Sequence, residues 1–185
     1  YEQANISAGL KGSPLSDLWF NVYGGYQRIR NDLFCMDYYT EPIPADAPIV
    51  YNLTNTSNFY IGGDVNYDYK DMFGIGLNAK YQNWDADNEY AYLLKPELSF
   101  GAQVNFNPIK QLGINLGYQF IQRAKAKDIE RLKAVSNLNI GANYELFENI
   151  SIYAKATNLL NTKHSYYLNY MDQAMSFMGG MSFRF

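Results

Sequence analysis

The sequence is poor in the residues from which many catalytic and metal sites are built. It has one cysteine, Cys35, so no disulfide can form within the chain, and one histidine, His164, so no multi-histidine metal site can form. A formal net charge of −3 gives no reason to expect nucleic acid as a partner. These shortages predict a protein that is not an enzyme and that holds no metal and no cofactor.

The chain also lacks a long apolar run, since no stretch approaches the roughly 18 residues of a membrane-spanning helix. Hydrophobic residues nevertheless make up 48% of the sequence, and they alternate with polar or small ones. Between Phe73 and Gln82, for example, Phe, Ile, Leu, Ala and Tyr alternate with Gly, Gly, Asn, Lys and Gln. This period of two is typical of β-strands with one apolar face. Nine segments show it: 4–11, 18–27, 59–69, 73–82, 97–106, 112–120, 137–144, 150–157 and 174–185.

The last of these segments ends the chain on an aromatic residue. Its apolar face carries Met181, Phe183 and Phe185, opposite Gly180, Ser182 and Arg184. A strand that ends on Phe resembles the closing strand of bacterial outer-membrane barrels, in which such an end is the signal for assembly. The resemblance implies that Met181, Phe183 and Phe185 form an assembly signal, with the barrel-assembly machinery as a partner.

The links between the segments alternate in length, which predicts an orientation. Short links, such as 70–72 and 147–149, alternate with long ones, such as 32–57 and 161–173. Transmembrane barrels have short periplasmic turns and long external loops, so we expect an all-β, antiparallel, up-and-down transmembrane β-barrel in the cell outer membrane. Its apolar face would meet lipid and its polar face the lumen. A soluble antiparallel barrel or sandwich remains an alternative, because alternation alone does not say which face points inward.

Nine is an odd number of strands, whereas bacterial barrels of this kind have an even number. In an up-and-down order the first and ninth strands run in the same direction, so they could close only through a parallel seam. We therefore expect residues 1–185 to be the C-terminal portion of a larger barrel, with further strands upstream. The chain begins at Tyr1 without a signal peptide, which fits a mature exported product or a piece of a longer chain.

A family resemblance appears in residues 150–164, ISIYAKATNLLNTKH. This segment resembles the strand and N-L-L-N-x-K-Y sequence near the end of TonB-dependent outer-membrane receptors, with His164 in place of the usual Tyr. The likeness covers residues 150–185. It implies uptake of a scarce nutrient (a metal chelate, corrinoid or glycan), energised by TonB, with a plug domain upstream and, in some cases, a surface lipoprotein. No plug is visible in this chain. A passive porin or small structural barrel is the alternative, and a soluble β-barrel binding protein is a second.

Aromatic residues gather in the predicted outer loops, where flat amphipathic rings would suit ligand capture. An interfacial belt or self-packed loops would explain them without a ligand. The candidate ligand-binding residues are Trp84, Tyr90, Tyr92, Tyr166, Tyr167 and Tyr170.

Two further features of the predicted loops concern charge and turn geometry. The third loop carries five basic residues that suit the phosphates of lipopolysaccharide; they are Arg123, Lys125, Lys127, Arg131 and Lys133. Outer-membrane lipid and lipopolysaccharide are therefore expected partners, and a solvated charged loop that needs no ligand is the alternative. Asn158 and Asn161 are expected to support the turn that leaves the eighth strand.

Overall fold

The computed structural model describes residues 1–35, 51–88, 91, 95–125, 133–162, 165–167, 170–171 and 174–184. These residues form eleven strands: β1 (Glu2–Leu15), β2 (Leu18–Cys35), β3 (Tyr51–Tyr69), β4 (Phe73–Ala86), β5 (Pro96–Ile109), β6 (Leu112–Arg123), β7 (Val135–Phe147), β8 (Ile150–Thr157), β9 (Ser165–Tyr167), β10 (Tyr170–Met171) and β11 (Ser176–Phe183). In this part of the chain no helix is long and apolar enough to cross a membrane.

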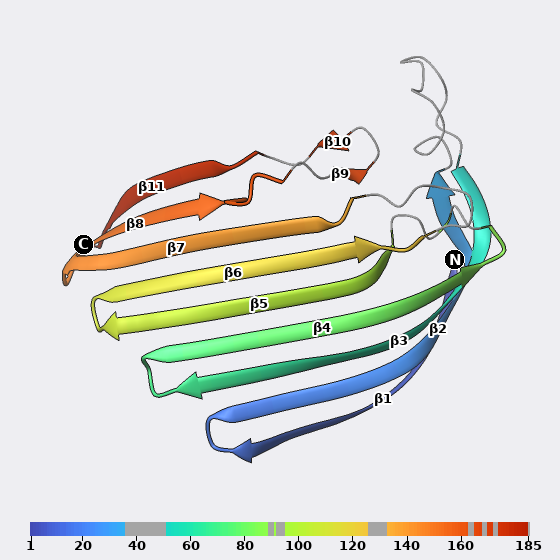
Figure 1. Ribbon diagram of the computed structural model, residues 1–185, viewed down its shortest axis with the longest axis horizontal. Helices are drawn as coiled ribbons and strands as arrows, with labels where there is room; N and C mark the ends of the chain where they lie inside the picture. Colours follow the sequence, from blue (N-terminus) through green and yellow to red (C-terminus); the bar gives the residue numbers. More distant parts are fainter. Residues whose placement is uncertain are drawn as a thin grey trace.

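One antiparallel sheet contains nine of these strands in the order β1-β2-β3-β4-β5-β6-β7-β8-β11, as Figure 1 shows. The nine strands predicted from the sequence are therefore confirmed. The remaining two, β9 and β10, pair with each other in a separate two-stranded ribbon within the link from β8 to β11.

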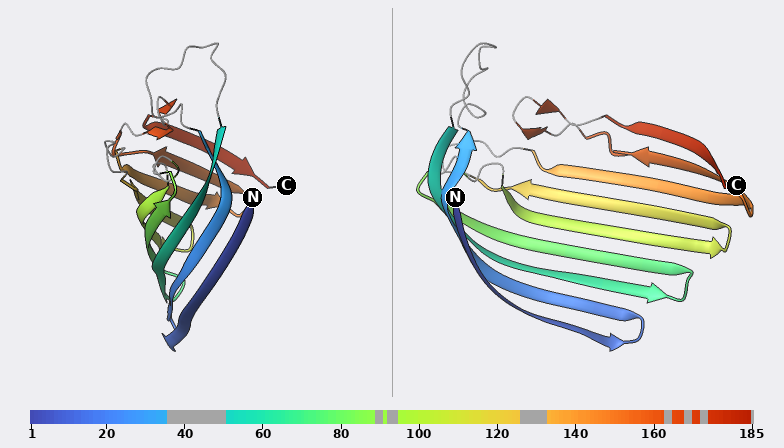
Figure 2. Two further views of the ribbon diagram at one scale, coloured as in Figure 1. Left: turned by 90° about the vertical axis from the view of Figure 1, so that its right-hand side faces the viewer. Right: turned by 180° about the vertical axis from the view of Figure 1, so that it is seen from behind.

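Hairpin turns of two or three residues join β1 to β2, β3 to β4, β5 to β6 and β7 to β8. All four turns lie at one end of the sheet together with the C-terminus, and the N-terminus lies at the other end (Figure 1). The links 36–50, 87–95, 124–134 and 158–175 leave from the end that holds the N-terminus. This is the arrangement that the alternating link lengths predicted. The two views in Figure 2 show that the sheet is strongly curved and remains open between β1 and β11.

The strand register keeps residues of one kind on one face. In the middle of the sheet, a continuous row of partners runs from strand to strand and is apolar throughout: Phe20, Val65, Leu77, Ala102, Tyr118 and Leu138. The neighbouring row on the opposite face is formed by amides and glycines: Asn66, Gly76, Gln103, Gly117 and Asn139. The alternation of apolar and polar residues within each strand thus produces two chemically distinct faces of the sheet.

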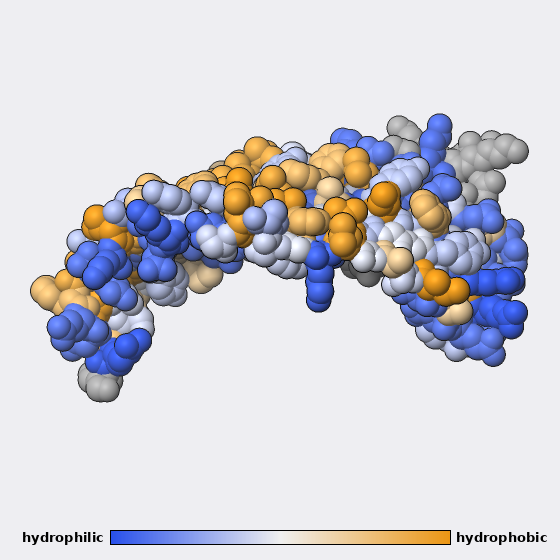
Figure 3. Space-filling view, turned by 90° about the horizontal axis from the view of Figure 1, so that it is seen from below, coloured by the Kyte–Doolittle hydropathy of each residue, from blue (hydrophilic) through white to orange (hydrophobic). Residues whose placement is uncertain are grey.

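The apolar face is the exposed, convex one. Figure 3 shows hydrophobic residues along the convex side of the arched sheet. The accessible surface of the whole chain is 12622 Å², whereas a soluble globular protein of this mass would expose about 9,100 Å². On β3, Leu53 and Phe59 are 64% and 56% exposed, while the polar Thr56 and Asn58 between and beside them are 2% and 1% exposed. Such inverted burial is expected where lipid covers the convex face.

Aromatic side chains border this convex apolar face at both ends. Tyr26 and Phe59 are register partners near the N-terminal end of the sheet, and Tyr69 pairs with Phe73 near the hairpin turns. Phe59 and Tyr69 are ten residues apart on β3. At about 3.3 Å per residue and a tilt of about 40°, this separation spans roughly 25 Å, the height of the apolar band of transmembrane barrels.

One prediction about strand limits was wrong. The alternation on β2 was taken to end before Asp32 and that on β3 to begin after Ser57, but β2 reaches Cys35 and β3 begins at Tyr51. On β3, residues 55–58 (NTSN) are polar on both faces and show no alternation. On β2 a β-bulge explains the error, because the register shifts between Ile29 and Asp32 and Asn31 has a left-handed φ of 55°. The extra residue reverses the alternation, so the period-two pattern breaks although the strand continues.

The expected turn after β8 is present. Asn158 and Asn161 have φ values of 52° and 45°, a conformation that Asn adopts more readily than most residues. The Asn161 N–H donates to the Asn158 carbonyl at 2.8 Å, and the Asn161 side chain accepts from the Met175 N–H at 3.4 Å, just before β11. The two asparagines therefore shape the turn mainly through their backbone, and Asn161 also ties it to the start of the last strand.

Candidate functional site on the concave wall

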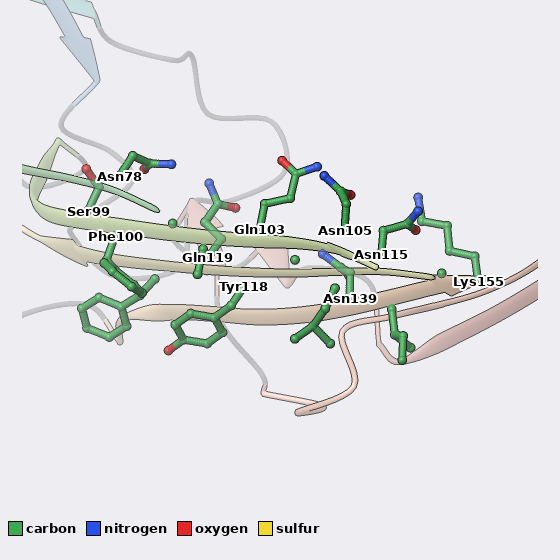
Figure 4. A pocket seen from close by; sticks show the side chains of 17 residues that line it. Asn78, Ser99, Phe100, Gln103, Asn105, Asn115, Tyr118, Gln119, Asn139 and Lys155 are labelled. Carbon is green, nitrogen blue, oxygen red and sulfur yellow. The ribbon is translucent and has the colours of Figure 1, made fainter. Parts of the chain in front are cut away.

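The polar face of the sheet, which we call the concave wall, is the candidate functional surface. At its centre a shallow hollow of about 600 Å³ lies over β4 to β8. Figure 4 shows that Gln103, Gln119 and Lys155 project to one side of the strands, whereas Phe100 and Tyr118 project to the other. The polar lining residues on the concave face are Asn78, Ser99, Gln103, Asn105, Asn115, Gln119, Asn139 and Lys155.

Much of the concave wall is kept flat by side chains that lie over glycines. A Cβ added to Gly62 would come within 2.7 Å of the Tyr23 ring, and one added to Gly25 would come within 2.6 Å of the Tyr60 hydroxyl. Each such pair is directly opposite in the strand register. The same arrangement holds for Asn66 over Gly76, Asp68 over Gly74, Asn78 over Gly101, Asn115 over Gly141, Asn143 over Gly113 and Tyr153 over Gly180. Long side chains thus lie along the wall, which leaves the space above it open.

Polar side chains on β1 to β4 contact one another. Asn21 donates to the Asp64 carboxylate at 3.1 Å, and the Tyr60 hydroxyl donates to Asn5 Oδ1 at 3.0 Å. The Lys80 ammonium lies 4.6 Å from the centre of the Tyr60 ring, within cation–π range. This part of the wall is consequently held in place by internal contacts.

A buried polar cluster lies where β2 to β5 meet the longer links. The bulge at Asn31 turns Asp32 toward the concave wall, where its carboxylate accepts from the Thr56 hydroxyl at 2.9 Å and forms an ion pair with Lys95. The Lys95 ammonium also lies 4.6 Å from the centre of the Trp84 ring. Because both charged side chains are largely buried, each depends on the other for compensation. The cluster joins β5 to β2 across the two strands between them.

Trp84 lies in β4 and not in an outer loop, which corrects its predicted placement. β4 pairs with β3 as far as Ala86, so the strand continues beyond the point at which its alternation was taken to end. The Trp84 indole N–H donates to the Pro96 carbonyl at 2.8 Å, and Lys95 covers its ring. Both the ring and the N–H of Trp84 therefore contact other residues of the same chain.

The structure does not place the other candidate ligand residues together. Tyr90 and Tyr92 lie outside the described residues. Tyr166 and Tyr167 belong to β9 and Tyr170 to β10, so their backbones are paired within the short ribbon. Their role in ligand capture stays a prediction.

The predicted assembly signal lies on the last strand. Met181 and Phe183 pair with Ile152 and Ile150 on β8 and are exposed on the apolar face, as the sequence predicted. Phe185 lies outside the described residues. The role of these residues as an assembly signal stays a prediction.

Arg123 was assigned to a basic outer loop, and this assignment was wrong. It is the last residue of β6, pairs in register with Pro96 and is only 8% exposed. Lys125 and Lys133 flank the link that follows, whereas Lys127 and Arg131 lie outside the described residues. A basic patch of five residues is therefore not what the structure presents.

Sequence reasoning missed two features of the concave wall. Asp32 and Lys95 are 63 residues apart, and only the bulge brings the carboxylate to the inner face. The amides of the hollow were recognised as polar-face residues, but the strand register that brings Gln103, Asn115 and Asn139 together was not. No count of residues in single strands indicates it.

Comparisons with known proteins agree on the kind of fold. A profile of the OmpA-like transmembrane domain matches residues 54–179. No curated protein matches the sequence.

Among solved structures, the pyoverdine outer-membrane receptor FpvA from Pseudomonas aeruginosa PAO1 superposes with a TM-score of 0.74 at 10% identity, over 99% of this chain and 30% of FpvA. The ferric-catecholate import receptor Fiu from Escherichia coli K12 gives 0.70 at 12% identity, over 99% of this chain and 27% of Fiu. OmpT, an outer-membrane protein of Vibrio cholerae, gives 0.57 at 14% identity, over 98% of this chain and 55% of OmpT.

These likenesses establish the fold as an all-β, antiparallel transmembrane barrel of the outer membrane. At such low identities they carry the fold alone. The chain spans less than a third of the two receptors, so a whole receptor's activity cannot be read from the superposition.

Proposed function

The chain belongs to the family of OmpA-like transmembrane domains, and from this premise we propose that it is the C-terminal part of a TonB-dependent receptor that imports a scarce nutrient through the outer membrane. The nutrient is a metal chelate, a corrinoid or a glycan. The observation that carries the proposal is the superposition of 98–99% of this chain on import and siderophore receptors such as Fiu and FpvA. The N-L-L-N-x-K sequence at residues 158–163 supports it independently.

The geometry of the sheet supports a larger barrel. The nine strands of the described sheet alternate in direction, so β1 and β11 run parallel to each other. In lipid each unpaired backbone group at a sheet edge costs several kcal/mol. An odd number of further strands would pair both edges in antiparallel fashion. We propose that sequence upstream of Tyr1 supplies these strands and a plug domain.

The proposed partners follow from the same proposal. TonB would supply the energy, and a surface lipoprotein could assist capture of the nutrient. The barrel-assembly machinery would recognise the last strand through Met181, Phe183 and Phe185, and lipid and lipopolysaccharide would cover the convex face. The protein would carry out transport without catalysis.

A second candidate is favoured by the family match itself: a passive porin or structural barrel that needs no energy coupling. The two candidates differ in how they depend on TonB. A plugged receptor passes a large solute only when energised, whereas an open pore is indifferent to TonB.

The experiment compares uptake with and without TonB. Cells that express the full-length protein are given a radiolabelled ferric catecholate, cyanocobalamin or maltotriose, and accumulation is measured. We expect accumulation of one of the three to fall to background when TonB is deleted and to return when it is restored. Accumulation that persists without TonB would favour the porin, and accumulation of none of the three would contradict the receptor.

A further inference from the structure

Gly117 lies in the middle of β6 at the centre of the hollow, and the presence of glycine inside a strand calls for a structural explanation. Glycine inside a strand costs roughly 0.5–1 kcal/mol relative to alanine, and it usually marks a special backbone conformation, a bulge or a close approach by another group. No described glycine has a positive φ, and the register runs without a shift from Gln103 through Gly117 to Asn139. The first two reasons therefore do not apply.

The chain itself does not approach Gly117 either. A Cβ placed there would have no described heavy atom within 4 Å beyond its own chain neighbours. The two other glycines in the hollow differ, since Asn78 lies over Gly101 and Asn115 lies over Gly141. The internal packing thus leaves the space above Gly117 empty, and a molecule in the lumen is the remaining candidate for a close approach.

Amide side chains surround this open floor on all four sides. Gln103 and Asn139 flank Gly117 on the neighbouring strands, and Asn115 and Gln119 precede and follow it by two residues on β6. All four belong to the lining of the hollow, and Figure 4 shows them around its centre.

Most of these amides have unused hydrogen-bonding capacity. Among the described residues, Gln103, Asn115 and Gln119 make no side-chain hydrogen bond, and Asn139 accepts one, from the Asn158 N–H at 3.1 Å. Some amides elsewhere on the wall are bonded, such as Asn21 to Asp64, and Asn58 to Gln82 at 3.2 Å. The amides around Gly117 therefore keep free donors and acceptors beside a glycine that no described side chain covers.

We propose that the hollow centred on Gly117 is a binding site for a neutral, hydroxyl-rich solute of oligosaccharide size. Each amide offers a donor pair and an acceptor, which matches hydroxyl groups that both donate and accept. Among the described residues that line the hollow there is no carboxylate and Lys155 alone is charged, which favours an uncharged ligand. A volume of about 600 Å³ lies within the usual range of ligand pockets. Gly117 lets the ring of the solute rest against the strand. The assignment rests on the proposed function and names its substrate class.

The test uses calorimetric titration of the full-length protein in detergent with maltotriose, xylotriose and mannotriose. Gly117→Leu fills the floor of the hollow without a clash inside the chain, so the barrel should still fold and show heat-modifiable mobility on gels. We expect it to weaken binding of the trisaccharide that binds by at least about tenfold. Gln119→Leu removes one hydrogen-bonding amide and should weaken binding by about three- to tenfold. The matched control is Asn66→Leu, the same kind of change on the wall outside the hollow, which should stay within twofold.

Two results overturn the proposal: no binding of any of the three trisaccharides at about 10 mM, or binding that Gly117→Leu leaves unchanged. Polypeptide, including the plug domain proposed above, is the other possible occupant. Gly117→Cys, in a Cys35→Ser background, should react with a membrane-impermeant maleimide and be protected by the bound trisaccharide. Protection without any sugar would show that protein covers the hollow and would overturn the proposal. Binding does not require TonB, so uptake that persists without TonB, with trisaccharide binding intact, contradicts the proposed function alone.

Discussion

Replacing Leu116 by arginine is expected to destabilise the folded barrel by about 2–4 kcal/mol, because an arginine on the lipid face near the bilayer midplane has to leave water. Leu116 lies on the convex face near the middle of β6, in register with Val104 and Ile140. The control is Gln119→Arg on the same strand. Gln119 faces the concave wall, so the new charge should remain in water and cost less than about 1 kcal/mol.

Urea unfolding of the full-length protein from lipid vesicles measures both variants. The two substitutions introduce the same side chain three residues apart, so β-propensity and net charge change almost equally. A large effect of Gln119→Arg with little effect of Leu116→Arg would mean that the concave face is the one in contact with lipid.

Replacing Gly25 by valine is expected to cost about 3 kcal/mol, at the upper end of the range for overpacking. A Cβ at this position would lie 2.5 Å from the carbonyl oxygen of Ile6 and 2.6 Å from the Tyr60 hydroxyl. The tyrosine could move aside, but the carbonyl belongs to the paired backbone of β1, so relief requires a shift of that strand. The edge pairing of β1 with β2 should weaken first.

Gly117→Val is the matched control for Gly25→Val. Both change an inner-face glycine in a strand, but the side chain at Gly117 would enter open space. We expect its free energy of unfolding to change by no more than an ordinary surface substitution does, about 0.5 kcal/mol. Equal losses in the two variants would contradict the claim that close contacts at Gly25 set the cost.

The sheet could be predicted from the sequence because alternation survives wherever the strand is regular. From Phe73 to Gln82 each residue falls on the face that its polarity indicated, and the link lengths correctly placed the hairpin turns at one end. The upper part of β2 could not be predicted. The bulge at Asn31 reverses the alternation, and a left-handed residue leaves no periodic trace in one sequence.

The candidate site was less predictable, since it depends on contacts across strands. Nothing in the sequence indicates a partner for Trp84, but in the structure the Lys95 ammonium lies over its ring and its N–H donates to the Pro96 carbonyl. Gly117 cannot be told in the sequence from Gly141, although Asn115 covers only the latter. Only the strand register shows which glycines serve internal packing and which one is left open.

The central claim is that the apolar convex face contacts lipid and the concave wall faces the lumen. Spin labels on single cysteines placed in turn at positions 114–120 of β6, in a Cys35→Ser background of the full-length protein in vesicles, test it directly. Membrane-dissolved oxygen should collide most with labels at Ile114, Leu116, Tyr118 and Phe120, and a water-soluble nickel chelate most with those at Asn115, Gly117 and Gln119. Opposite phases, or collisions that do not alternate with a period of two, would contradict the claim.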